Sequence, residues 1–189
     1  TYNKRSIYNS MTSRLLVDKI EGKTTANNIA MPSGFVVQTV TNITTNANNV
    51  TANGSFTNIT ASEVTITSKL ANSAFLYMAT MSAEADATSN FYIYIQMRYQ
   101  INGGSSIIHP SAQNRILNGT SGLNSMGTIN QTINYLFDGI TSGAGTTFKF
   151  FFQHRQDTTS SFQYNQQSLG SQPSGKSNSS SITVTEIAT

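Results

Sequence analysis

The amino-acid sequence predicts an all-β protein in which antiparallel strands form two packed sheets. Its 189 residues include 26 Thr, 25 Ser, 20 Asn and 11 Gln, whereas only 10% of the residues are charged. The 10 Phe and 8 Tyr supply bulk for one hydrophobic core. Thr, Tyr, Phe, Val and Ile favour strands, and Ser, Asn and Gly favour the turns between them. Short strand-like runs recur along the chain, and no long helical stripe of apolar residues interrupts them.

The first 34 residues differ from the rest and predict an extended arm. Five of the 11 basic residues fall in this segment, and its only apolar stretch lies between Leu15 and Ile20. The sequence Pro32–Gly34 is a turn or hinge signal ahead of the first strand. We therefore expect two parts, an N-terminal docking arm over residues 1–34 and a β-sandwich domain over residues 35–189.

The first half of the domain contains the weaker strand signals. Phe35–Val40 follows the turn signal and is apolar at most positions, and the Thr- and Asn-rich stretch after it either continues this strand or pairs with it. Phe56–Ile59 and Val64–Thr67 are two further short strand-like runs. Ala74–Met81 is a stronger, largely apolar run. Each of the four segments is expected to form a strand.

Phe91–Ile101 shows the clearest two-residue period. Ile95, Met97 and their alternating neighbours form an apolar face directed at the core. The other face carries polar side chains toward solvent or a neighbouring subunit, namely Tyr92, Tyr94, Gln96, Arg98 and Gln100. Strand-like patterns continue in Ile129–Phe137, Thr146–Arg155 and Ile182–Ile187.

About eight strands in residues 35–189 predict a jelly-roll-like antiparallel sandwich, with an immunoglobulin-like sandwich as the alternative. Two segments of low complexity, Thr41–Thr60 and Thr158–Ser181, are expected to be long solvated loops. The alternative for the second segment is a sugar-binding edge, because aromatic rings stack on sugars and amides bond to hydroxyls. Its members would be Phe162, Gln163, Tyr164 and Gln166.

The sequence contains no convincing set of catalytic or metal-binding residues, so no enzyme activity, metal or cofactor is expected. Only two histidines are present. His154 shares the face of the Phe residues before it and is expected to be a hydrogen-bonded or rim histidine, and His109 is expected in a loop turn before Pro110. Glu84 and Asp86 are the only close pair of acids in the domain, and they are expected in a solvated or calcium-touching turn.

Charge and composition exclude further classes of function. The formal net charge is only +3, and the basic residues are scattered, so nucleic-acid binding is not expected. No apolar run approaches the roughly 20 residues that span a bilayer, and residues 1–30 lack the apolar segment of a signal peptide. The chain has no cysteine, so packing or oligomerisation must replace disulfides. We expect a protein without a membrane-inserted segment.

The order of motifs resembles that of small structural proteins of tailed bacteriophages, especially marine and cyanobacterial ones. Ser13–Gly22 and Ile29–Gly34 resemble the opening of these proteins. Four later segments resemble the first, middle, penultimate and last strands of the family's Ser- and Thr-rich β-domain: Gly34–Val40, Val64–Ser68, Thr146–Phe152 and Ser181–Ile187.

This resemblance implies a non-enzymatic virion protein, a capsid decoration or head-fibre protein that is assembled in the host cytoplasm and forms a homotrimer. The arm would dock on the major capsid protein or a tail component through Arg14, Leu15, Leu16, Val17, Lys19 and Ile20. The alternative is a short tail fibre or fibre tip that binds a host surface glycan. Its exposed contact residues would be Tyr92, Tyr94, Phe162 and Tyr164.

Overall fold

The computed structural model describes residues 33–45, 48–51, 54–86, 91–119, 127–156, 161–165 and 179–189. These residues contain eleven strands and one short 3-10 helix, η1 (Thr60–Ser62). The strands are β1 (Val36–Thr44), β2 (Asn48–Thr51), β3 (Thr57–Asn58), β4 (Val64–Thr67), β5 (Ala74–Asp86), β6 (Phe91–Ile101), β7 (Ile107–Gly119), β8 (Gly127–Phe137), β9 (Thr147–Gln156), β10 (Ser161–Tyr164) and β11 (Ser180–Ile187).

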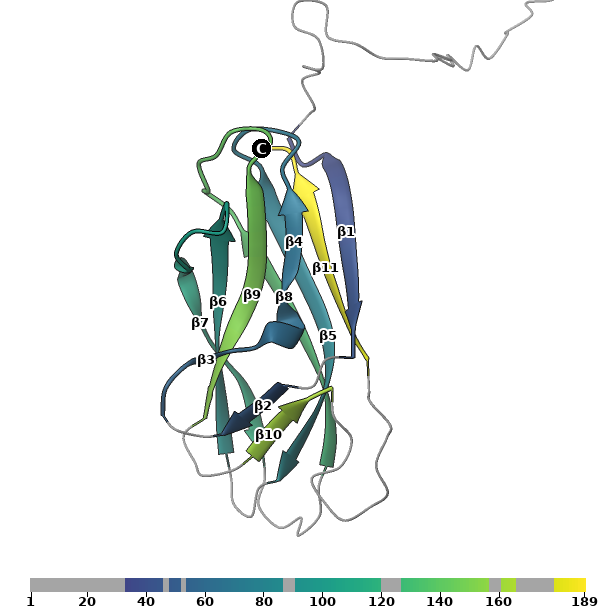
Figure 1. The fold of residues 1–189 in the computed structure, drawn as a ribbon, viewed down its shortest axis with the longest axis vertical. Coiled ribbons are helices and arrows are strands. Elements are labelled where there is room, and N and C mark those ends of the chain that lie inside the picture. The colour runs from purple at the N-terminus through teal and green to yellow at the C-terminus, as the bar shows by residue number, and fades with distance from the viewer. Residues whose placement is uncertain are drawn as a thin grey trace, which may run out of the picture. The chain divides into compact units, whose positions relative to one another are not determined.

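Eight of these strands pair as a rolled-up hairpin (Figure 1). The eight strands are those that remain when the short strands β2, β3 and β10 are set aside. The first of them, β1, pairs with the last, β11, and the second, β4, pairs with the seventh, β9. The third pairs with the sixth, β5 with β8, and the fourth with the fifth, β6 with β7. All pairs are antiparallel, and this nested order is that of a jelly roll. The predicted fold is confirmed.

Two further pairings assemble the hairpin into two sheets. β5 also pairs with β11, which gives sheet A the order β1-β11-β5-β8. β6 also pairs with β9, which gives sheet B the order β4-β9-β6-β7. The short strands lengthen these sheets: β10 pairs with β5 beyond β11, β2 pairs with β10, and β3 pairs with β9 beyond β4.

The strand predictions succeed where a segment alternates or is largely apolar. β4 and β6 have the predicted bounds. β5 continues to Asp86, so Glu84 and Asp86 lie in a strand and the expectation that they lie in a turn is wrong. β2 and β10 lie in the two segments that were expected to be solvated loops, so this expectation is wrong at both places.

β7 was not predicted, and it contains both His109 and Pro110. The expectation that His109 is a turn residue is therefore wrong. β7 is the outermost strand of sheet B, and an edge strand tolerates a proline because one side of it needs no hydrogen-bond donor. Its polar sequence hides the strand from a search for alternating residues.

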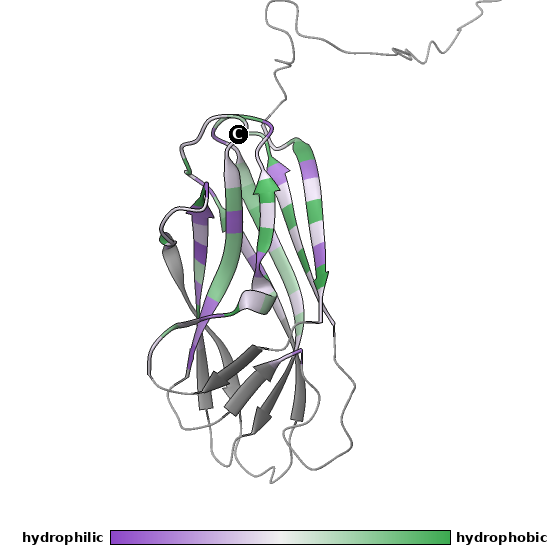
Figure 2. Cartoon of the chain, in the orientation of Figure 1, coloured by the Kyte–Doolittle hydropathy of each residue, from purple (hydrophilic) through white to green (hydrophobic). Residues whose placement is uncertain are grey.

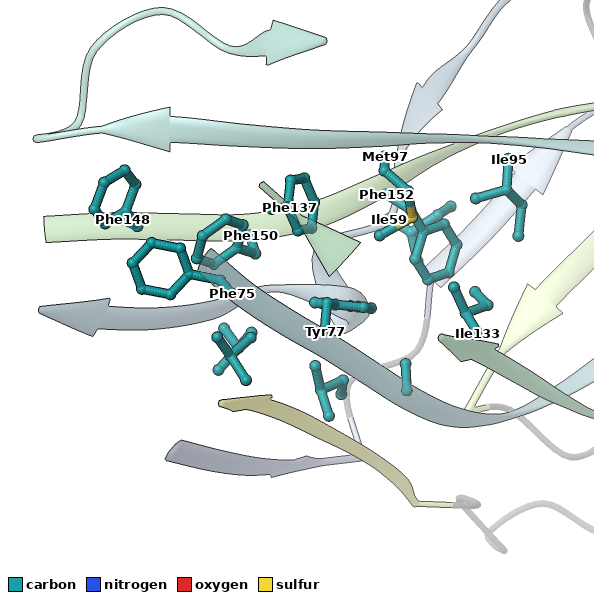
Figure 3. Packing of buried hydrophobic residues seen from close by; sticks show 14 of the residues in the cluster. Ile59, Phe75, Tyr77, Ile95, Met97, Ile133, Phe137, Phe148, Phe150 and Phe152 are labelled. Atoms are coloured by element: carbon teal, nitrogen blue, oxygen red, sulfur yellow. The ribbon is translucent and has the colours of Figure 1, made fainter. Parts of the chain in front are cut away.

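Side chains from the facing sides of both sheets form one hydrophobic core (Figure 3). Phe148, Phe150 and Phe152 of β9 point into it, as do Ile95 and Met97 of β6, and both predictions are confirmed. The rings of Phe75, Phe137 and Phe150 pack closely, with centroids 5.1 Å and 4.6 Å from that of Phe150. This packing fixes the spacing of the two sheets.

The loops between β4 and β5, β6 and β7, and β8 and β9 are tied together at the end where the C-terminal residues lie. Ser68 N donates to Thr146 O at 2.9 Å, and Gly145 N donates back to Ser68 O at 2.8 Å. Asn102 N donates to Thr147 O at 2.8 Å, and Asn102 Oδ1 accepts from Thr147 N at 3.0 Å. This network holds the loop end in one arrangement.

Candidate functional site

The expected docking residues lie outside the described residues: Arg14, Leu15, Leu16, Val17, Lys19 and Ile20. The described chain begins at the predicted turn, which Ser33 and Gly34 form with Gly34 at a φ of 83°. Gly34 N donates to Ala188 O at 2.8 Å, and Ala188 N donates to Phe35 O at 2.9 Å. The entry to the domain is therefore fixed beside its C-terminal residues.

The four expected glycan contacts do not form one exposed group. Tyr164 is fully buried in the core, so the prediction that it is exposed is wrong. Its hydroxyl and His154 Nδ1 lie 2.9 Å apart and share a hydrogen bond inside the sandwich. Tyr94 is half-buried on the outer side of sheet B. Tyr92 lies in β6 and Phe162 in β10, and their side chains are outside what the structure describes.

The outer side of sheet B carries interleaved amides and cations, which we call the amide–arginine face. Its members are Gln96 and Arg98 of β6 and Lys149, Gln153 and Arg155 of β9. Hydrophilic bands mark their strands in Figure 2. The backbone register sets Gln96 opposite Gln153. Gln96 was expected to face solvent or a neighbouring subunit; its side chain points outward, yet it is only 5% exposed.

Aromatic rings hold the cations of this face in place. The Arg155 guanidinium lies 4.4 Å from the Tyr94 ring centroid and 5.3 Å from that of Phe56. Lys149 Nζ lies 5.6 Å from the Phe151 centroid and 3.3 Å from Glu63 Oε1. Phe151 is almost completely buried although it points away from the core. Long side chains thus cover apolar surface on this face while keeping their charges at its rim.

The outer side of sheet A has the opposite character, and we call it the neutral face. Its described members are Thr39, Thr41, Ile43, Leu76, Met78, Thr80, Thr132, Asn134, Leu136, Thr183 and Thr185. None of them carries a charge. Threonines on β1 and β11 bond to each other, Thr39 to Thr185 at 3.2 Å and Thr41 to Thr183 at 3.0 Å between hydroxyl oxygens. Met78 and Leu136 are 36% and 46% exposed.

Glu186 is a fully buried carboxylate that the sequence did not single out. Oε1 accepts from Lys69 N at 2.9 Å, Leu70 N at 3.0 Å and Ser73 Oγ at 2.8 Å, and Oε2 accepts from Gln38 Nε2 at 2.6 Å. Four donors from β1 and the β4–β5 loop therefore converge on one side chain of β11. Gln38 Nε2 also donates to Thr67 O at 2.6 Å, which joins an edge of sheet A to an edge of sheet B.

Both histidines take part in packing contacts between aromatic side chains. His154 is completely buried, and burial lowers the pKa of its imidazole to about 3. The expected hydrogen-bonded role is confirmed, in the core rather than at a rim. His109 Nδ1 lies 2.6 Å from the Tyr135 hydroxyl, and this contact joins β7 to β8 at the other edge of the sandwich. Burial and the charge of Asp138 raise the pKa of Tyr135.

The side chains of Glu186, His109 and His154 are engaged in hydrogen bonds that join strands and loops, and this arrangement suits structural stabilisation. In the described ranges, no group of three or more His, Asp or Glu side chains could hold a metal ion. The same part of the chain contains no helix long and apolar enough to cross a bilayer.

No protein-family model and no curated protein sequence matches the chain. Among solved structures, the chain is similar to a chain of infectious bursal disease virus, Gx strain, with 10% identity and a TM-score of 0.38 over 82% of this chain and 39% of the viral one. A chain of the Gt strain gives 9% identity and a TM-score of 0.27 over 80% and 42%. This protein thus spans about two fifths of the length of each viral chain. At these identities and TM-scores the likeness implies no function for this chain.

Proposed function

We propose that the chain is a non-enzymatic structural protein of a bacteriophage virion, a capsid decoration or head-fibre protein that forms a homotrimer. The observation that carries this proposal is the neutral face of sheet A. Burying a charged side chain without a partner costs several kcal/mol, so surfaces that become buried on assembly are poor in charge at their centre. The eleven described members of the neutral face meet this condition.

The hydroxyl pairs of the neutral face support the same role. A polar group that loses water and finds no partner destabilises a complex by about 1–3 kcal/mol. Thr39 with Thr185 and Thr41 with Thr183 already bond to each other, so covering them by a second copy leaves one hydroxyl donor per pair to be satisfied instead of two. Met78 and Leu136 then supply apolar area. A second and a third copy of this chain are the occupants that we propose for this face.

Substitution of the neutral face tests the oligomer. We expect the unmodified protein to be a trimer and the double variant Met78→Lys with Leu136→Lys to be a monomer, because two lysines per subunit would have to be desolvated. Light scattering after size-exclusion chromatography measures the mass, and circular dichroism checks that the strands persist. Ser105→Lys, in the exposed β6–β7 loop, is the matched control and should stay trimeric. A monomeric unmodified protein at tens of micromolar, or a trimeric double variant, would contradict the proposal.

The second part of the proposal is that the N-terminal arm docks the trimer on the major capsid protein or, if the protein is a short tail fibre, on a tail component. The entry of the chain is hydrogen-bonded to the C-terminal residues, which gives an arm a fixed point of attachment. Tied loops surround this end of the domain.

Removal of the arm tests the docking. Deleting residues 1–32 keeps Gly34 and its bond to Ala188, so the domain should fold unchanged while co-sedimentation with phage particles is lost. The full-length variant Leu15→Asp with Leu16→Asp should lose docking to a similar extent. Immunogold labelling then distinguishes the two positions: gold over the head supports decoration, and gold at the tail supports the fibre. Undiminished co-sedimentation of both variants would disprove docking through the arm.

A further inference from the structure

Arg98, a cation of the amide–arginine face, has a hydrogen-bonding group that the described residues leave unused: its Nε is buried and has no hydrogen-bond partner among them. Gln96, two residues before it on the same side of β6, is only 5% exposed. Gln96 and Arg98 both point to the outer side of β6, because Ile95 and Met97, which alternate with them along the strand, face the core.

Unused polar groups of this kind call for an explanation in the function of the surface. A buried polar group without a partner destabilises a protein by about 1–3 kcal/mol, and most such groups in folded proteins are satisfied. The amide-rich neighbourhood extends across the sheet, because Gln153, opposite Gln96, donates through Nε2 to Asn58 Oδ1 at 2.6 Å. The geometry points to a site that is completed by a ligand rich in hydrogen-bonding groups.

We propose that the amide–arginine face binds an acidic polysaccharide, with Gln96 and Arg98 at the centre of the site. An amide offers both a donor and an acceptor, as a sugar hydroxyl does, so Gln96 and Gln153 suit a polyhydroxylated chain. A guanidinium offers paired donors that match a carboxylate or sulfate. This inference does not rest on the proposed virion role, and it places the site on the outer side of sheet B instead of at Tyr164, which is buried in the core.

Charge density favours a polysaccharide over a nucleic acid. The described charged groups at this face are Arg98, Lys149 and Arg155, with Glu63 beside Lys149, which gives three cations against one carboxylate and a net charge of +2. Arg155 and Lys149 are six residues apart on β9, or roughly 20 Å along an extended strand. Double-stranded DNA carries a charge every ~1.7 Å, so this face matches a sparsely charged chain far better.

Binding measurements on the full-length protein test the site. The probes are hyaluronan, which has a carboxylate on every second sugar, alginate and lightly sulfated dextran, with plain dextran as the uncharged control and duplex DNA as the dense polyanion. We expect at least one acidic polysaccharide to bind, plain dextran not to bind, and DNA to bind at least about tenfold more weakly at physiological salt. Failure of all three acidic probes, or tighter binding of DNA, would overturn the proposal.

Two substitutions locate the site. Gln96→Met keeps the length and volume of the side chain and removes the amide, and we expect about tenfold weaker binding with a nearly unchanged melting temperature, because the packing of the site is conserved. Arg98→Met should weaken binding by a similar or larger factor. Lys69→Gln removes the same charge from an exposed loop position and should leave affinity nearly unchanged. A lower melting temperature for Gln96→Met with undiminished affinity would mean that Gln96 serves the fold alone, and would overturn the assignment.

Discussion

Replacing Glu186 with Gln is expected to lower the free energy of unfolding by about 3–5 kcal/mol. Four donor groups, two backbone N–H groups, the Ser73 hydroxyl and the Gln38 amide, converge on the two oxygens of this buried carboxylate. The amide nitrogen of the variant would place donor against donor at one oxygen position and would remove the charge that strengthens the remaining bonds. The β4–β5 loop would then lose its attachment to β11.

Chemical unfolding followed by circular dichroism measures this loss. Glu63→Gln is the matched control, because it neutralises another glutamate whose partner, Lys149, lies 3.3 Å away at a half-exposed site. Its expected cost is below about 1 kcal/mol. Equal effects of the two substitutions would show that the Glu186 bonds contribute no more than a surface ion pair, and would contradict the role that we assign to this carboxylate.

The sequence predicts a strand well where one face of the strand is buried in the core and the other face is exposed. β4 and β6 have their predicted bounds because alternation alone marks a strand that is covered on one face. The prediction that Phe148, Phe150 and Phe152 face the core is correct for the same reason. These features depend on neighbouring residues in the chain, which a single sequence displays.

Features that depend on distant partners were not predictable. β10 is a strand because it extends the pairing of β5 beyond the end of β11, and nothing in its local sequence reveals that partner. β7 carries a proline and polar residues, and its position at the edge of sheet B permits both. Jelly-roll pairing is almost entirely between strands far apart in the chain, so local propensity underestimates the strand content.

The same limit applies to the sites. Tyr164 was expected at the surface because it lies in a segment of low complexity that predicts a solvated loop or a sugar-binding edge, and its core position follows from the pairing of β10 with β5. The sequence contains one indication that Glu186 is buried: it alternates with Ile182 and Val184 along β11 and so lies on the same inward face. An acid at an inward position of a strand predicts a buried, hydrogen-bonded carboxylate. The donors that satisfy it come from residues more than 100 positions earlier, which only the fold brings close.

Acidification is expected to destabilise the protein through His154. Its pKa is about 3 in the folded protein and 6.5 in an unperturbed chain, and burial is the cause of the difference. The unfolded chain therefore binds a proton more readily between these values. The stability that neutral His154 contributes is fully present above pH 6.5 and is lost as the pH falls toward 3. Between pH 7.5 and 4.5 this residue alone should lower the free energy of unfolding by about 2.5 kcal/mol.

A variant without the titrating group separates this effect from the protonation of carboxylates. His154→Gln retains a polar side chain near the Tyr164 hydroxyl and removes the imidazole. Because the acidic residues are the same in both proteins, their contributions cancel when the loss of stability between pH 7.5 and 4.5 is compared. We expect the unmodified protein to lose about 2.5 kcal/mol more than the variant in chemical unfolding at the two pH values. In NMR spectra, the imidazole signal that disappears in the variant should not titrate between pH 7.5 and 4.5. A signal that titrates near pH 6.5, with equal losses in both proteins, would mean that water reaches the ring and that His154 is not held neutral by the core.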